Sequence, residues 1–301
     1  MAKRRSWPWL GSASALLVSL RPSHWAKNLF IFLPLVFGGQ LGHAEADRRV
    51  VWGFWIFSLL SSSAYLLNDV VDRAADRRHP KKRFRPIAAG RLDVRVAVVS
   101  ACGLTAAALG LAFPLDPAFG WTAVAYLALN LAYSLGVKHW VILDVACLGG
   151  FFVMRIVAGA VLARVVPSHW IILLTFLLAL FLGFTKRRQE IAWLKGERSR
   201  TGVLAEYDPY FIDQVSSVLT ASIAIVYLLY TVDRDTVERV GSVHLLLSAP
   251  CVYYGVFRYL YVIHRIKVAR DPTSIFWLDR PLQIDLALWI AVCVAVIYGR
   301  V

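Results

Sequence analysis

Hydrophobic residues along this chain come in blocks of about twenty, separated by short polar segments. A helix of that length spans the ~30 Å hydrocarbon core of a bilayer, and a backbone surrounded by lipid must satisfy its own hydrogen bonds. The pattern therefore predicts an all-α membrane protein with nine transmembrane helices. We place them at residues 23–43, 50–70, 94–113, 117–135, 140–163, 168–185, 211–231, 243–264 and 282–300, with Pro34 interrupting the first.

The composition and charge support this prediction. Hydrophobic residues make up 58% of the 301 residues and the mean hydropathy is +0.60, well above a soluble domain. A net charge of +14 could indicate a nucleic-acid-binding protein, but the distribution of the basic residues along the chain argues against this. With nine spans and a cytoplasmic N-terminus, 25 of the 33 Lys and Arg fall in cytoplasmic segments and six in external ones. This positive-inside bias predicts a plasma-membrane protein with a cytoplasmic N-terminus and no nucleic-acid partner.

The sequence shows no separate soluble domain and no low-complexity linker, so we predict one transmembrane domain over residues 1–301. Residues 1–20 are basic and then mildly apolar, which is typical of a cytoplasmic or interfacial segment leading into the first span. The cytoplasmic loops carry the patterned polar residues, whereas the external loops are short. We therefore expect the chemistry on the cytoplasmic face.

An acidic row at the end of the second span is the strongest signal. Asp69, Asp72 and Asp76 follow Asn68 at spacings of three and four, which places them near one helix face. Carboxylates so close repel each other unless a cation neutralises them, and oxygen ligands of this kind suit Mg²⁺. A merely solvated helix end is the alternative, which the cost of ionised groups in an apolar span disfavours. The row predicts a Mg²⁺ site.

A second polar stripe ends the fourth span. Asn130, Ser134 and Lys138 are spaced by four, as in the acidic row, and Tyr133 lies beside them. Two helices thus offer polar residues at one membrane depth. The basic run after the acidic row, with Arg83 and Arg85, either neutralises substrate phosphates or contacts lipid headgroups.

Two charged residues fall in the next apolar block. Asp144 begins it and Arg155 follows eleven residues later, about three helical turns and ~16 Å on. The two share a face, and Arg155 lies near mid-membrane, where a charge faces the bundle interior and needs a partner. The sequence leaves open whether these two residues pair with neighbouring helices or contact the substrate.

Further basic residues border other spans. The sixth span ends in Lys186, Arg187 and, one turn later, Glu190, which could help to hold a metal or could simply mark a helix end. Lys27 and Asn28 open the first span and are placed to reach the same polar groups.

The acidic row resembles the first aspartate motif of the UbiA superfamily. The matching residues are Asn68-Asp69-x-x-Asp72-x-x-x-Asp76, then His79-Pro80, Arg85-Pro86 and Gly90. The resemblance implies a helical bundle around a central cavity, in which aspartate motifs bind a prenyl diphosphate through Mg²⁺.

One departure from the typical superfamily member points to a branch of it. Where those members carry a second aspartate motif, this chain reads Lys186-Arg187-Arg188-Gln189-Glu190. Together with Arg21-Pro22-x-x-Trp25-x-Lys27-Asn28 and Tyr133-Ser134-x-x-x-Lys138, this resembles the decaprenyl-phosphate phosphoribosyltransferases. That branch transfers 5-phosphoribosyl from phosphoribosyl pyrophosphate to a polyprenyl phosphate for cell-wall arabinan.

The resemblance implies the following roles. Asp69, Asp72, Lys138 and Lys186 are predicted to be catalytic, with Asp69, Asp72 and Asp76 as Mg²⁺ ligands. Substrate-binding residues are predicted to be Lys27, Asn28, Asn68, Arg83, Arg85, Tyr133, Asp144, Arg155, Arg187 and Glu190. Membrane lipids surround the chain, and a homo-oligomer is compatible with the sequence.

Two alternatives stay open at this point. One is a Mg²⁺-dependent prenyltransferase that moves a prenyl group from its diphosphate to an aromatic acceptor. The other is a lipid transporter or flippase, which broken helices around a midplane site would favour. The polar residues here gather at one face and do not line a pathway, so the enzyme is favoured.

Overall fold

The computed structural model describes residues 11–194, 202–265, 275 and 278–299. No strand occurs among these residues, which confirms the all-α class. The α-helices and 3₁₀ helices (η) are, in chain order, α1 (Ser12–Leu20), η1 (Pro22–Phe32), α2 (Leu33–Phe37), α3 (Ala44–Val71), α4 (Arg73–Arg78), η2 (Lys82–Phe84), α5 (Val94–Leu115), α6 (Pro117–Leu135), η3 (Val137–His139), α7 (Leu143–Ala163), α8 (His169–Leu194), η4 (Gly202–Ala205), α9 (Pro209–Val232), α10 (Arg234–Val240), η5 (Val243–Ser248), α11 (Ala249–Arg265) and α13 (Arg280–Tyr298).

The chain forms two compact units. Unit 1 comprises Met1–Leu135 and Met154–Val166, and unit 2 comprises Gly136–Val153 and Pro167–Val301. Helix α7 therefore contributes its first half to unit 2 and its second half to unit 1. The single domain and the central cavity expected from the sequence stay predictions.

Eight helices within the described residues are long and apolar enough to cross a membrane, and they coincide with eight of the nine predicted spans. The first predicted segment, 23–43, is not among these eight. There the chain forms η1 and, directly after it, the short α2, with Pro34 in the first turn of α2, and neither helix alone has the length of a span.

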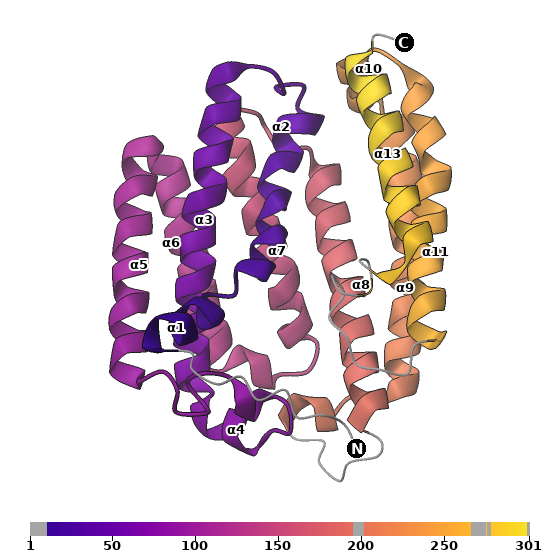
Figure 1. Ribbon diagram of the computed structural model, residues 1–301. Coiled ribbons are helices and arrows are strands. Elements are labelled where there is room, and N and C mark those ends of the chain that lie inside the picture. The colour runs from indigo at the N-terminus through magenta and orange to yellow at the C-terminus, as the bar shows by residue number, and fades with distance from the viewer. Residues whose placement is uncertain (1–10, 195–201, 266–274, 276–277, 300–301) are drawn as a thin grey trace. The chain divides into compact units, whose positions relative to one another are not determined.

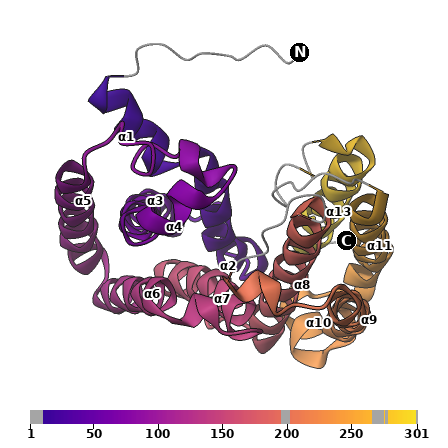
Figure 2. The ribbon, with the colours of Figure 1, turned by 90° about the horizontal axis from the view of Figure 1, so that it is seen from below.

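In unit 1, α3 packs against η1, α5 and α6, and α3, α5 and α6 run side by side (Figures 1 and 2). Buried serines of α3 supply polar contacts to its neighbours. Ser63 Oγ donates to the carbonyl of Ala101 in α5 at 2.9 Å, and Trp25 Nε1 of η1 donates to Ser62 Oγ at 3.0 Å. Small polar residues at such interfaces let helices approach closely in a membrane.

In unit 2, α9 packs against α8 and α11, and α13 packs against α11. An aromatic and aliphatic core fills the space between these helices and includes Phe181, Phe184, Ile223 and Tyr259. Asp208 and Asp279 cap α9 and α13 by accepting from Phe211 N and Leu282 N. Such caps satisfy backbone donors at a helix start.

Helix α8 continues beyond the predicted end of the sixth span at residue 185, as far as Leu194. Lys and Arg are good helix formers, so the basic cluster, for which a helix end was one of two interpretations, extends the helix. This extension places Arg187 and Glu190 one turn apart on α8, where Arg187 Nη1 donates to Glu190 Oε2 at 2.9 Å.

Candidate active site

The acidic row begins with a carboxylate that two arginines engage. Asp69 lies in the last turn of α3, and its side chain is 2% exposed. Arg21 Nη2 donates to Asp69 Oδ1 at 2.5 Å, and Arg85 Nη1 donates to the same oxygen at 3.0 Å. Arg21 adopts a left-handed backbone conformation (φ +52°) between α1 and η1. Strain of this kind clusters at functional sites.

Asp76 shares Arg85 with Asp69. Arg85 Nη1 also donates to Asp76 Oδ2 at 2.7 Å. Asp76 is buried in α4, and burial raises the pKa of its carboxyl, while the charge of Arg85 opposes that rise. The half-buried Asp72 separates α3 from α4, but its backbone is helical, and Asp72 N still donates to Asn68 O and Asp76 N to Asp72 O at 2.8 Å each. Asp69 and Asp76, which we expected on one helix face, meet at one cation.

These carboxylates fit a magnesium site that the substrate completes. In the parts of the chain that the structure describes, no three Asp, Glu, His or Cys side chains form a group that could hold a metal by itself. Mg²⁺ is usually bound through one or two carboxylates together with substrate phosphates and water. Arg85 shows that Asp69 and Asp76 converge on a single positive charge. The assignment of Asp69, Asp72 and Asp76 to Mg²⁺ stays a prediction.

The two polar stripes expected at one membrane depth do touch. Ser134 Oγ of α6 donates to Asn68 Oδ1 of α3 at 3.1 Å. This contact leaves the amide nitrogen of Asn68 as the donor that can face another group. Tyr133 is half-buried next to Ser134.

Arg155 is buried in unit 1 and pairs with neutral groups. Its side chain lies in the second half of α7, and the residue is 3% exposed. Nε donates to Asn28 Oδ1 at 2.8 Å, and Nη2 donates to the hydroxyl of Tyr126 at 3.0 Å. Asn28 in turn donates to Ser58 and Ser61 of α3. The prediction that a mid-membrane arginine turns inward and finds partners is confirmed.

Asp144 is the centre of a buried cluster in unit 2. The residue is 0% exposed. Tyr207 donates its hydroxyl hydrogen to Asp144 Oδ1 at 2.6 Å, and Arg187 donates to Oδ2 from Nε at 3.0 Å and lies 2.9 Å away through Nη2. The same tyrosine oxygen accepts from Ile142 N at 2.7 Å. Burial, reinforced by the bond to Asp144, raises the pKa of Tyr207, so the phenol stays a donor.

Arg187 bridges two carboxylates, because it contacts Glu190 as well as Asp144. We had expected Glu190 as a metal ligand or a helix-end residue, and its described partner is this arginine. The neighbouring Arg188 pairs separately with Asp213 of α9 at 2.8 Å. The basic cluster of α8 is therefore partly neutralised by carboxylates of its own unit.

The other predicted residues are more accessible. Lys27 of η1, Lys138 of η3 and Lys186 of α8 are half-buried. Arg83 is exposed, with its guanidinium carbon 4.9 Å from the centre of the Phe84 ring. Arg83 thus lies outside the Asp69–Arg85–Asp76 cluster.

Two residues of these clusters were not among the predicted site residues. Arg21 lies 48 residues from Asp69 and Tyr207 lies 63 residues from Asp144. Arg21 was visible in the Arg21-Pro22 motif, but only the fold shows its partner. Nothing in the sequence around Tyr207 marked it.

Comparison with known proteins decides the family. The UbiA prenyltransferase family model matches residues 28–279. The chain belongs to the UbiA prenyltransferase family. Eight long apolar helices lie among its described residues, and it is an integral membrane protein.

Two curated relatives and one solved structure illustrate the UbiA similarity. The decaprenyl-phosphate phosphoribosyltransferase of Mycolicibacterium smegmatis is 32% identical, over 95% of this chain and 93% of the relative. The protein of the same name from Mycobacterium tuberculosis is 31% identical over 95% of each chain. A UbiA homologue from Archaeoglobus fulgidus, solved with DMAPP and Mg²⁺, has a TM-score of 0.71 and 22% identity, covering 94% of this chain and 99% of the other. This last likeness shows the fold alone.

Proposed function

We propose that the protein transfers 5-phosphoribosyl from phosphoribosyl pyrophosphate to a polyprenyl phosphate and releases pyrophosphate. The observation that carries this proposal is the similarity to decaprenyl-phosphate phosphoribosyltransferases, which extends over 95% of the chain. The product would be a precursor for cell-wall arabinan, as the resemblance of the sequence motifs to that branch implies.

The charges of the two units support this choice of substrates. A prenyl diphosphate carries phosphates at one end only, whereas phosphoribosyl pyrophosphate adds a 5-phosphate and the acceptor brings another. The additional phosphate groups require additional Lys and Arg side chains to neutralise their charge. The third cytoplasmic segment supplies Lys186, Arg187 and Arg188 where typical family members are acidic. Charge-assisted contacts to phosphate are the strong hydrogen bonds of such sites.

In unit 1, we assign the acidic residues to the pyrophosphate of the donor. Asp69, Asp72 and Asp76 would hold Mg²⁺, and when bound this ion would neutralise charge that develops on the leaving pyrophosphate. Asn68 is held through its oxygen by Ser134, so its amide nitrogen can donate to a phosphate oxygen. Arg85 adds a positive charge beside the same carboxylates.

In unit 2, we assign Lys138, Lys186 and Arg187 to the remaining phosphates. The bond from ribose C1 to the pyrophosphate oxygen breaks, and a bond from C1 to an oxygen of the acceptor phosphate forms. The acceptor phosphate is already an anion, so no strong general base is needed. Electrostatic stabilisation of the leaving group is then the main contribution of the protein.

Purified protein in detergent tests this proposal. We expect labelled phosphoribosyl pyrophosphate to yield a phosphoribosylated lipid when polyprenyl phosphate and Mg²⁺ are present, and no product after the metal is chelated. Turnover in detergent, without a membrane gradient, would also exclude transport as the main role. Transfer of a prenyl group to an aromatic acid, with phosphoribosyl pyrophosphate left unconsumed, would replace the proposal with the aromatic prenyltransferase.

The proposed orientation places the N-terminus and the acidic row in the cytoplasm, on the strength of the basic bias. Arg83 is exposed in η2, which follows α4, and Val166 is 90% exposed in the loop between α7 and α8. In a Cys102→Ser background, which removes the exposed native thiol, we expect an impermeant thiol reagent added to intact cells to label Val166→Cys and not Arg83→Cys. Labelling of Arg83→Cys alone would reverse the topology.

A further inference from the structure

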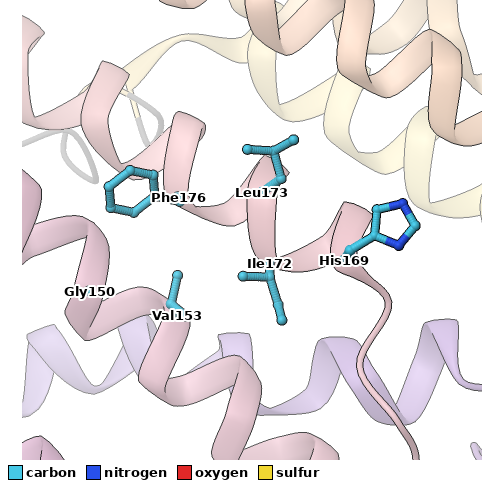
Figure 3. A pocket seen from close by; sticks show the side chains of 6 residues that line it. All are labelled: Gly150, Val153, His169, Ile172, Leu173 and Phe176. Carbon is cyan, nitrogen blue, oxygen red and sulfur yellow. The ribbon is translucent and has the colours of Figure 1, made fainter.

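A strained backbone residue precedes α7, apart from the apolar cavity of unit 2. The cavity, of about 430 Å³, lies against α7 and α8, and His169 is the one described lining residue with a polar side chain (Figure 3). Ile142, directly before α7, has a left-handed backbone conformation (φ +71°). A β-branched residue rarely adopts this conformation, because its Cβ crowds the following carbonyl. Such strain persists where surrounding contacts impose it.

The hydroxyl of Tyr207 is the contact that fixes the backbone of Ile142. Ile142 N donates to Tyr207 Oη at 2.7 Å. Ile142 is 49% exposed, so burial of its own side chain does not account for its conformation. Tyr207 is 2% exposed, and its ring packs edge-on against Phe184 of α8, with the ring centres 6.1 Å apart. A buried residue that is held by its ring therefore sets the backbone of an exposed one.

Ile142 joins the start of α7 to η3, which carries Lys138. Hydrogen bonds run through the connecting turn, because Asp144 N donates to Trp140 O at 3.0 Å and Trp140 N donates to the carbonyl of the first residue of η3 at 3.0 Å. η3 also contacts η4, which ends two residues before Tyr207. Lys138 thus lies on a short hydrogen-bonded segment that the Tyr207–Ile142 bond fixes at its far end. A change of φ at Ile142 would move η3 relative to α7.

The same hydroxyl also reaches Arg187, through Asp144. Tyr207 donates to Asp144 Oδ1 at 2.6 Å, and Asp144 Oδ2 accepts from Arg187 Nε at 3.0 Å. A hydroxyl group has one hydrogen and two lone pairs, so Tyr207 can donate to Asp144 while it accepts from Ile142. Two of the cations that we assign to substrate phosphates, Lys138 on η3 and Arg187 on α8, are therefore tied to one oxygen atom.

We propose that Tyr207 is a positioning residue for phosphoribosyl transfer: its hydroxyl holds Ile142 in the left-handed conformation and thereby sets where Lys138 lies. The proposal rests on the proposed function, which assigns Lys138 to a substrate phosphate. It adds a residue that acts through Lys138 and not by contact with the substrate. A tyrosine that only filled the core would need its ring and not its hydroxyl, so removal of the hydroxyl separates the two roles.

Tyr207→Phe keeps the ring and removes the hydroxyl. Tyr227→Phe is the matched control, because Tyr227 of α9 is 5% exposed and its hydroxyl also has two close partners, Ser248 Oγ at 2.7 Å and Trp289 Nε1 at 2.8 Å. At a temperature well below both thermal midpoints, we expect Tyr207→Phe to lower kcat/KM about tenfold, the scale of one misplaced charge-assisted hydrogen bond. Tyr227→Phe should lower the thermal midpoint and leave kcat/KM unchanged. An unchanged kcat/KM in Tyr207→Phe would overturn the proposal.

Two further variants test whether Tyr207 acts through Ile142 and Lys138. Glycine adopts positive φ without steric cost, so adding Ile142→Gly to Tyr207→Phe should recover part of the lost kcat/KM. In a Lys138→Met background, Tyr207→Phe should cost little more, because the group that it positions is already gone. No recovery with glycine, or the full tenfold loss in the Lys138→Met background, would contradict the proposed route.

Hydrogen–deuterium exchange of the segment 137–146 provides a measurement that needs no turnover. Tyr207→Phe should speed exchange in this segment, because the Ile142 amide loses its acceptor and the strained turn opens more often. Tyr227→Phe should leave it unchanged. Equal exchange in Tyr207→Phe and the wild type would show that the hydroxyl does not hold the turn. If the wild type transferred no phosphoribosyl group, the proposed function would fail instead, and the exchange rates would still decide whether Tyr207 holds Ile142.

Discussion

Asp69→Asn should lower phosphoribosyl transfer by about two to three orders of magnitude, the scale of losing one charge-stabilising group in an active site. Asp69 is the most buried carboxylate of the acidic row and receives hydrogen bonds from Arg21 and Arg85. Asparagine keeps the size of the side chain but removes the charge that Mg²⁺ and both arginines require. The measurement is initial rate against Mg²⁺ concentration for the purified variant.

A control separates loss of metal binding from loss of the ion pair. Arg21→Gln removes the 2.5 Å contact to Asp69 but leaves the carboxylate in place. We expect Arg21→Gln and Asp69→Asn to lower the thermal midpoint by similar amounts, while only Asp69→Asn changes the Mg²⁺ dependence. If Asp69→Asn keeps the wild-type rate at limiting Mg²⁺, the metal assignment is wrong.

The membrane helices could be predicted because each apolar block is long enough to specify a span by itself. Hydropathy said less about local backbone geometry. The apolar block 23–43 forms η1 followed directly by α2. At Lys186 a helix end was one of two interpretations of the positive charge, but its residues favour helix and pair along it, so α8 runs on to Leu194.

The candidate site could be predicted as a set of residues but not as a set of contacts. Spacing within a helix identified Asp69 and Asp76, and the depth of Arg155 in its span indicated that it turns inward. The partners come from segments far away in the chain, such as Arg21 for Asp69 and Tyr207 for Asp144. Only the packing of helices decides which distant side chains meet, so no local pattern could supply these pairs.

The Asp144 cluster leads to the second large expected effect. Arg187→Gln would remove the arginine that pairs with the fully buried Asp144 carboxylate. Of the side-chain donors described at Asp144, the Tyr207 hydroxyl would remain. Removing one partner of a buried ion pair costs about 3–5 kcal/mol, because the remaining charge is buried without compensation. We expect a marked fall in the thermal midpoint in detergent. Arg188→Gln, the same change one residue on, breaks a partly exposed pair with Asp213 and should cost about 1 kcal/mol or less.

Adding Asp144→Asn to Arg187→Gln should then restore most of the lost stability, because no uncompensated charge is left in the interior. Turnover of this double variant tells the two roles of Arg187 apart. If Arg187 only neutralises Asp144, the rate returns together with the thermal midpoint. If Arg187 also binds a substrate phosphate, as we propose, the midpoint returns while kcat/KM stays about tenfold or more below wild type, the scale of one charge-assisted hydrogen bond. A double variant as unstable as Arg187→Gln alone would show that buried charge at Asp144 is not the cause of the instability.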